Sequence, residues 1–141
     1  NLNLFNNGGD GLDVGDNCVV INCKAMNNGE NGILANFGNV IRDCVTAYNG
    51  YNGIDAFRFN NVYSCVSYKN SLDGIDISLA ARVEGCTVYE NLNSGIDIFR
   101  GGICLNNVVS INTVRSYKMF VMGMEYVFQT LPVPITLKEQ I

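Results

Sequence analysis

A step of 21 residues runs through the chain and constrains its fold more than any other feature. Glycines recur at this step, each followed by an aliphatic residue: Gly11, Gly32, Gly53, Gly74 and Gly95. Asparagines keep the same step: Asn7, Asn28, Asn49, Asn70, Asn91 and Asn112. A third column is Cys23, Cys44, Cys65 and Cys86, and a fourth is Val20, Ile41, Val62, Val83 and Cys104. Because no insertion or deletion disturbs this phase, the repeats should share one shape and stack directly on their neighbours.

The residues inside each repeat decide which kind of solenoid is expected. Leucine-rich repeats need several leucines at fixed offsets, and helical repeats are longer and need a period of 3.6 residues, and neither pattern is present. Each repeat instead holds short alternating stretches rich in β-branched residues and bounded by Asn and Gly, as at positions 95–99. The sequence therefore predicts an all-β, right-handed parallel β-helix of about five rungs, each rung made of three strands.

In such a coil every residue lies about 4.8 Å above its equivalent in the preceding rung, so a column in the sequence becomes a ladder in space. We expect the asparagines to form a ladder in which each side-chain amide donates to the carbonyl oxygen of the next. For the repeated glycines we expect either a positive φ or a tight bend before the following strand.

The repeat divides the chain into two parts. At 141 residues it fits one domain, with the β-helix over 1–112 and a non-repeat segment over 113–141. An open solenoid end exposes unpaired backbone, so we expect residues 116–130 to cap the last rung or to form an oligomer interface. The chain starts inside a rung and without the basic residues that open a signal peptide, so we expect a longer parent protein.

Composition excludes several classes of function. Apolar residues make up 48% and charged residues 16%, which favours a folded chain over a disordered one. The net charge of −4 argues against a nucleic-acid partner, because nucleic-acid binding depends on clustered Lys and Arg. The absence of histidine excludes Ser-His-Asp and Cys-His catalysis and the usual zinc-enzyme ligand sets. No apolar run is long enough for a membrane span, so no membrane partner is expected.

The cysteine column predicts buried, unpaired thiols. Neighbouring cysteines in one column are close enough for a disulfide, but their Cβ atoms point the same way, which fits poorly with the dihedral angle near 90° of a disulfide. Reduced thiols suit a cytoplasmic or anaerobic compartment. This expectation pulls against the extracellular or cell-surface location that the function considered below would require.

A column of carboxylates should lie on the outer face of the strand that follows each glycine. Alternation turns the aliphatic residue inward and the next residue outward, which gives Asp13, Leu34, Asp55, Asp76 and Asp97. Two unit charges one rung apart repel by about 3 kcal/mol at an effective dielectric constant of 20. A bound cation, a nearby arginine or a raised pKa of Asp76 would relieve this repulsion, and Ca²⁺ suits such oxygen ligands best. The bland alternative is a solvated acidic strip that only hydrates an exposed strand.

Aromatic and basic residues come next on the same strands. Phe57 and Phe99 are expected to face outward two rungs apart, where their rings could stack against sugars. Arg58 and Arg100 follow them directly and could bind the carboxylates of an acidic polymer by bidentate hydrogen bonds. The alternative is that the Phe pair is scattered surface or is covered by the C-terminal segment.

The repeat resembles that of a known family. The segments at 43–55 and 70–76, with their Asn-Gly and Asp-Gly-Ile-Asp sequences, resemble rungs of pectate-lyase-like β-helix proteins, and the resemblance spans residues 7–112. It is closest to the ninth family of polysaccharide lyases, in which an Asp-Asp-Gly-Phe-Asp stretch supplies calcium ligands and a lysine abstracts the proton α to the uronate carboxylate. The resemblance implies an acidic polysaccharide as the partner.

Carried over residue by residue, the resemblance makes Asp73 and Asp76 two of the calcium ligands. Leu72 stands where the first Asp of the family motif would be, and no lysine lies between Lys69 and Lys118. Since arginine serves as the base in related β-helix lyases, Arg100 is the candidate base here. The predicted metal ligands are thus Asp55, Asp73, Asp76 and Asp97, and the predicted substrate contacts are Phe57, Arg58 and Phe99.

Two functions remain in competition at this point. The first is a carbohydrate-associated β-helix protein, either a calcium-dependent lyase or a binder of uronate polysaccharide. The second is a non-catalytic structural or surface module, adhesin-like or tail-fibre-like, that oligomerises through its C-terminal segment. A solenoid without long loops offers a shallow site, which favours binding or structure over turnover.

Overall fold

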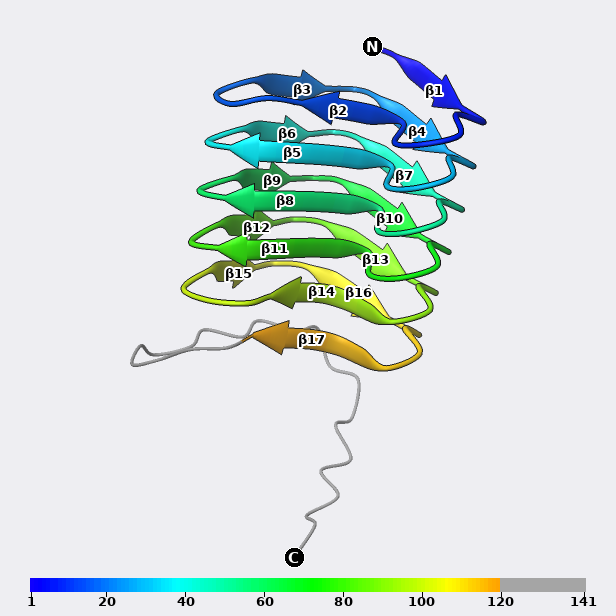
Figure 1. Cartoon of the computed structure of the whole chain (residues 1–141). Helices are drawn as coiled ribbons and strands as arrows, with labels where there is room; N and C mark the ends of the chain where they lie inside the picture. Colours follow the sequence, from blue (N-terminus) through cyan, green and yellow to red (C-terminus); the bar gives the residue numbers. More distant parts are fainter. Residues whose placement is uncertain (120–141) are drawn as a thin grey trace, which may run out of the picture.

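The computed structural model describes residues 1–119, with side chains described for residues 1–114. Within that range every regular element is a β-strand, and the strands form three parallel sheets that wrap around one axis. Each rung contributes one strand to each of the three sheets, called B, C and A in the order in which the chain passes through them, and the chain then begins the next rung. Figure 1 shows the rungs following one another from the N-terminus. The predicted right-handed parallel β-helix is confirmed.

Each sheet collects one strand from each rung. Sheet B contains β2 (Leu12–Val14), β5 (Ile33–Phe37), β8 (Ile54–Arg58), β11 (Ile75–Leu79), β14 (Ser94–Ile98) and β17 (Arg115–Met119). Sheet C contains β3 (Val19–Ile21), β6 (Val40–Arg42), β9 (Asn61–Tyr63), β12 (Arg82–Glu84) and β15 (Ile103–Leu105). Sheet A contains β1 (Asn3–Phe5), β4 (Lys24–Met26), β7 (Val45–Ala47), β10 (Val66–Tyr68), β13 (Thr87–Tyr89) and β16 (Val108–Ser110).

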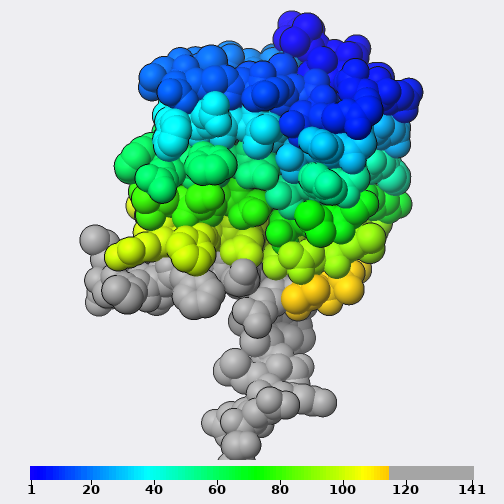
Figure 2. Space-filling model, viewed as in Figure 1, coloured from blue at the N-terminus to red at the C-terminus, as the bar shows by residue number. Residues whose placement is uncertain are grey.

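The register between rungs equals the step in the sequence. Ile33 pairs with Ile54 and Ile54 with Ile75, and the other paired strands keep the same offset of 21 residues. In the space-filling view each rung forms one flat layer, and the layers follow one another in sequence order (Figure 2). A position in the sequence is therefore a vertical row in the molecule, as the columns predicted.

Single residues with a left-handed backbone make the corners of each rung. Between sheets B and C they are Asn17, Gly38, Phe59, Ala80 and Gly101. Between sheets C and A they are Asn22, Asp43, Ser64, Gly85 and Asn106. After sheet A they are Asn6, Asn27, Tyr48, Lys69, Glu90 and Ile111. One residue with φ near +55° turns the chain sharply between two strands, and asparagine and glycine tolerate this conformation best.

The interior is filled by identical or similar residues stacked on one another. Ile33, Ile54, Ile75 and Ile96 are buried, as are Ile41, Val62 and Val83 from sheet C. The four cysteines of the third column are also buried, and all six cysteines in the chain are unpaired. The prediction of free, buried thiols is therefore confirmed for the cysteine column.

The asparagine ladder forms as predicted. The side-chain amide of each member donates to Oδ1 of the next at 2.9–3.0 Å, from Asn7 through to Asn112. Each member's backbone N–H also donates to that same Oδ1 at 3.0–3.1 Å. Asn28, Asn49, Asn70 and Asn91 are nearly inaccessible to solvent. The ladder thus satisfies the polar groups of a buried turn, which would otherwise destabilise the coil.

Close packing against the next rung, not a positive φ, explains why glycine recurs at these positions. Gly11, Gly32, Gly53 and Gly74 are not in the left-handed region, so that part of the expectation is wrong. A Cβ at Gly32 would lie 2.5 Å from the carbonyl oxygen of Gly53 and 2.7 Å from Nδ2 of Asn49. Glycine is needed because the backbone approaches the next rung and the asparagine ladder too closely for any side chain.

Residues 115–119 continue the coil after the last asparagine of the ladder. Strand β17 pairs with β14, so that Ser94 lies opposite Arg115 and Asp97 opposite Lys118, again 21 residues apart. Residues 120–141 lie outside the described residues, and most of the segment expected to cap the helix or to form an oligomer interface falls there. That role and the boundary at 112 stay predictions.

We predict that Gly53→Ala destabilises the fold. The added methyl group would collide with the Ser67 hydroxyl and would lie 2.6 Å from the carbonyl oxygen of Gly74, which cannot move without disturbing the next rung. We expect a loss of about 3 kcal/mol in the free energy of unfolding in urea. Gly15→Ala is the matched control, because nothing lies within 4 Å of its Cβ position. Equal stability of the two variants would contradict the explanation from close packing.

We also predict a position-dependent cost for losing ladder asparagines. Asn49→Ala removes the acceptor of Asn28 and the amide that donates to the Ala25 carbonyl and to Asn70, all in a buried turn. Unsatisfied buried groups cost about 1–3 kcal/mol each, so we expect a loss of about 3 kcal/mol or more by urea denaturation. Asn7→Ala loses one exposed side-chain hydrogen bond and should cost below about 1 kcal/mol. A similar loss at both positions would argue against the ladder.

Candidate functional site

The outer face of sheet B carries the carboxylate column that the sequence predicts. Asp55 pairs with Asp76 and Asp76 with Asp97, so three carboxylates lie on consecutive rungs. They are not fully solvated: Asp55 and Asp76 are half-buried, and Asp97 is only 8% exposed. Only Asp13, at the N-terminal end of the column, is fully exposed. The alternative of a freely hydrated strip therefore does not describe the C-terminal half of the column.

Asp73 does not belong to this column. It lies in a second polar ladder at the entrance to sheet B, formed by Asp10, Asn31, Asn52, Asp73 and Ser94. A side-chain oxygen of each member accepts the backbone N–H of the next, as in the 2.6 Å hydrogen bond from the Ser94 N–H to Asp73. Sequence reasoning missed this ladder, although the 21-residue step through polar positions was its signal. Asp73 is thus a buried structural acceptor.

Burial sets the electrostatics of this face. Desolvation raises the pKa of Asp55, partly offset by a hydrogen bond from the Asn52 side chain at 3.4 Å and reinforced by the nearby charges of Asp10 and Asp73. Desolvation likewise raises the pKa of Asp73, against the hydrogen bond that it accepts from Ser94. These carboxyl groups hold their protons more tightly than carboxyl groups in water, as expected where like charges gather in a poorly solvated place.

The carboxylates stand in a row and do not surround a point. Within residues 1–119, no group of three or more Asp, Glu or Cys side chains is placed so that it could hold a metal ion. Calcium in proteins takes six to eight oxygen ligands, so Asp55, Asp73, Asp76 and Asp97 do not by themselves form a calcium cage. Calcium binding by these residues stays a prediction.

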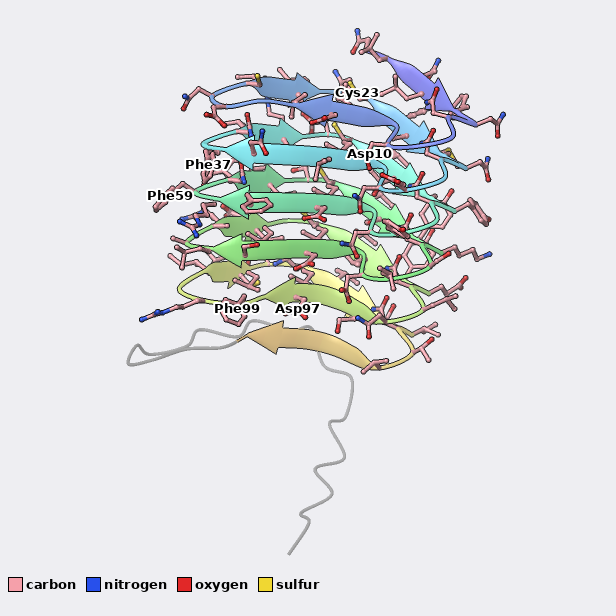
Figure 3. The ribbon with its side chains drawn as sticks, viewed as in Figure 1. Asp10, Cys23, Phe37, Phe59, Asp97 and Phe99 are labelled. Atoms are coloured by element: carbon pink, nitrogen blue, oxygen red, sulfur yellow. The ribbon has the colours of Figure 1, made fainter. Side chains whose placement is uncertain are left out.

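Exposed aromatic rings line one edge of sheet B. Phe57 and Phe99 face outward, 45% and 62% exposed, as the alternation predicts. Phe37 and Phe59, which the sequence did not single out, are exposed at the same edge, and the rings of Phe37 and Phe57 lie 6.0 Å apart. Figure 3 shows Phe37, Phe59 and Phe99 toward one edge of the coil and Asp10 near the other. We call Phe37, Phe57, Phe59 and Phe99 the aromatic edge.

The two predicted arginines lie at the aromatic edge. Arg58 ends β8, and Arg100 follows β14, with Leu79 on the rung between them. Both side chains are exposed, and neither forms an ion pair with a carboxylate in the described part of the chain. Both guanidinium groups are therefore accessible to solvent. No described contact assigns Arg100 to proton abstraction, and its catalytic role stays a prediction.

One lysine joins the acidic column at its C-terminal end. Strand β17 places Lys118 opposite Asp97, at the next position of the column. The sequence shows the step from 97 to 118, but the other columns fade by this point, so the lysine gave no signal of its own. The column therefore runs from Asp55 through Asp76 and Asp97 to a lysine position.

Comparisons with known proteins agree on the fold. No protein-family model matches the sequence, and no curated protein is significantly similar to it. Among solved structures, the A-module of mannuronan C-5 epimerase AlgE4 from Azotobacter vinelandii matches 79% of this chain and 37% of its own, with a TM-score of 0.65 and 18% identity. The AlgE6 A-module from the same organism matches 85% and 39%, with a TM-score of 0.57 and 18% identity.

A third similar structure is the periplasmic alginate epimerase AlgG, which matches 86% of this chain and 38% of its own, with a TM-score of 0.56 and 14% identity. The chain thus spans less than two fifths of the length of each of these structures. At these identities the likeness shows the fold alone, a parallel β-helix like the one described above. No helix among residues 1–119 could cross a membrane.

We predict that Asp73→Asn stabilises the protein at neutral pH. Since the folded state raises the pKa of Asp73, stability is greatest while the group is protonated and falls as the pH rises through the raised pKa. Asparagine keeps the acceptor for the Ser94 N–H, as Asn31 and Asn52 do in the same ladder, and carries no charge. In urea unfolding, the free energy of unfolding of the variant should exceed that of the parent at pH 7, and the two values should agree at about pH 3.5.

The control for this experiment is Asp13→Asn, an exposed carboxylate of the outer column, which should change stability by under about 0.5 kcal/mol at either pH. A variant at Asp73 that is less stable than the parent at pH 7 would show that the ionised carboxylate is needed there, for example by a bound cation.

Proposed function

We propose that this protein binds an acidic, uronate-type polysaccharide along the outer face of sheet B. One observation carries the proposal: a Phe-Arg pair occurs at 57–58 and again at 99–100, on the same edge of the same sheet and two rungs apart. Each pair offers an exposed ring and a neighbouring exposed guanidinium. A linear polymer that runs along the coil could meet both pairs at once.

The chemistry of the two side chains fits a polymer of sugar acids. The apolar face of a sugar ring stacks on an aromatic ring, and a uronate carboxylate accepts paired hydrogen bonds from a guanidinium. Phe37 and Phe59 would widen the stacking surface beside Phe57. The names of the similar structures, two mannuronan C-5 epimerases and an alginate epimerase, support a polymer of this class.

The acidic column next to the aromatic edge would repel a polyanion unless its charge is neutralised. The raised pKa of Asp55 reduces that charge on mild acidification. Calcium shared between the column and the uronate groups is the other route, with the polymer supplying the oxygens that the row of Asp55, Asp76 and Asp97 lacks. Calcium-dependent binding is therefore part of the proposal.

A second candidate is turnover at C5 of a bound uronate. The observation that favours it is the register position of Lys118 beside Asp97, because a lysine next to a carboxylate column could accept the C5 proton. Loss of that proton with cleavage of the C4–O bond gives an unsaturated product, and return of a proton to the opposite face gives the epimer. Arg100 is the alternative base.

The binding test uses isothermal titration with oligomannuronate, oligoguluronate and oligogalacturonate, with and without Ca²⁺, and a neutral cello-oligosaccharide as the negative ligand. Phe57→Ala and Arg58→Ala should each weaken binding of the acidic oligomer about tenfold, the equivalent of about 1.4 kcal/mol. Phe5→Ala on sheet A and Arg42→Ala on sheet C are matched controls, because both are exposed on other faces.

Each outcome of the titration decides something. Equal binding of acidic and neutral oligomers, or equal losses in the control variants, would refute the sheet B surface. Absorbance of an unsaturated product, or a change in the C5 configuration seen by NMR, would establish turnover, and its loss in Lys118→Ala but not Arg100→Ala would identify the base. A chain that binds no saccharide but forms a stable oligomer in light scattering would favour the structural module.

A further inference from the structure

The four cysteines of the repeat form a continuous row of sulfur atoms inside the coil. Cys23, Cys44, Cys65 and Cys86 each lie just before a strand of sheet A and are at most 5% exposed. The Val45 N–H donates to the Cys23 carbonyl at 2.9 Å, and the same hydrogen bond recurs below Cys44, Cys65 and Cys86. Successive cysteines are therefore one strand spacing apart, about 4.8 Å.

The thiols of the row all donate to the backbone. Each Sγ donates to the carbonyl oxygen two residues earlier, at 3.2 Å for Cys44 and Cys65. The hydrogen bond from Cys65 lowers the pKa of Cys44 to about 7, and donation to Cys44 raises that of Cys65.

This geometry discriminates among metal ions. Zinc needs four ligands that converge as a tetrahedron, and no three such groups converge within residues 1–119. A soft ion with two ligands in a line needs only a pair of sulfurs. Two metal–sulfur bonds of about 2.3 Å, the length found for Zn–S, span about 4.6 Å, which is close to one strand spacing. Soft thiolate ligands suit Cu(I), zinc and iron–sulfur clusters, and a pair of sulfurs in a line fits Cu(I) rather than the tetrahedral zinc sites.

We propose that the row of Cys23, Cys44, Cys65 and Cys86 is a binding site for a soft monovalent metal ion of the Cu(I) class, held linearly between consecutive sulfurs. The ion takes the place of one thiol proton: one S–H bond breaks, one thiolate–metal bond forms, the second sulfur donates a lone pair, and one proton leaves for each ion bound. One positive ion replaces one proton, so the buried row stays neutral and no net charge is buried in the core.

The first cysteine of the row borders a hollow. Cys23, its first member, lines a hollow of about 360 Å³ at the N-terminal end of the coil, together with Cys18. An ion that reaches the Cys23 thiol could pass to Cys44 and onward by exchanging one sulfur ligand at a time. The rest of the row is closed to solvent, which would shield the bound ion from competing ligands and oxidants.

The experiment titrates the reduced full chain with Cu(I) under nitrogen, in competition with a coloured Cu(I) chelator. We expect at least one equivalent of Cu(I) retained by the folded protein, a rise in Tm, thiolate-to-copper absorbance in the ultraviolet, and release of one proton per ion to an indicator dye. Cys44→Ala and Cys65→Ala should weaken the affinity at least tenfold, and each fold is checked by circular dichroism. Cys18→Ala, outside the row, should leave the equilibrium affinity within about twofold of the parent.

Three results would overturn the proposal. The first is that Cu(I) is bound only when the chain is unfolded, which would make the cysteines core residues alone. The second is that Cys18→Ala loses as much affinity as Cys44→Ala. The third is that Zn²⁺ competes on equal terms, which would require a convergent site. If either variant in the row does not fold, the Tm and the absorbance of the parent chain with Cu(I) decide the question, since a filler role predicts neither change.

Discussion

The direct stacking of each rung on the last, one strand spacing away, is the constraint on which the rest of the structure depends. It forces every residue to lie against its own equivalent above and below. Only some side chains gain from this arrangement. Asparagine amides donate and accept in one line, isoleucine and valine pack against copies of themselves, and glycine allows the backbone to pass under the Asn49 amide. This requirement explains why the same residue types recur every 21 positions.

Like charges break this rule, which makes the outer face of sheet B unusual. Asp55, Asp76 and Asp97 repeat on successive rungs where repulsion opposes them, and the burial of Asp97 removes the water that would screen it. The second polar ladder avoids repulsion between like charges, because Asn31 and Asn52 occupy the positions equivalent to Asp73 and carry no charge. The acidic column lies beside the exposed Phe-Arg pairs at 57–58 and 99–100.

Much of the fold was predictable because equivalent residues recur every 21 positions and stack on one another along the axis of the coil. Identical residues at Asn49 and Asn70 announce a ladder without any knowledge of the turn that holds it. The ladder through Asp10 and Ser94 was missed because its members differ in type and share only a side-chain oxygen acceptor. Phe37 was missed because it shares a column with Arg58, so that its contact with Phe57 is diagonal between rungs.

The sequence by itself determined the period, the strand order within a rung, the inward and outward sets and the free state of the cysteine column, because each of these follows from a regular step and from alternation. The tertiary structure alone decided burial and the true neighbours of each group. It placed Asp73 in a structural ladder and left Asp97 nearly inaccessible to solvent. Solvation and distance depend on what the neighbouring rungs place around a residue, and no single rung of sequence contains that information.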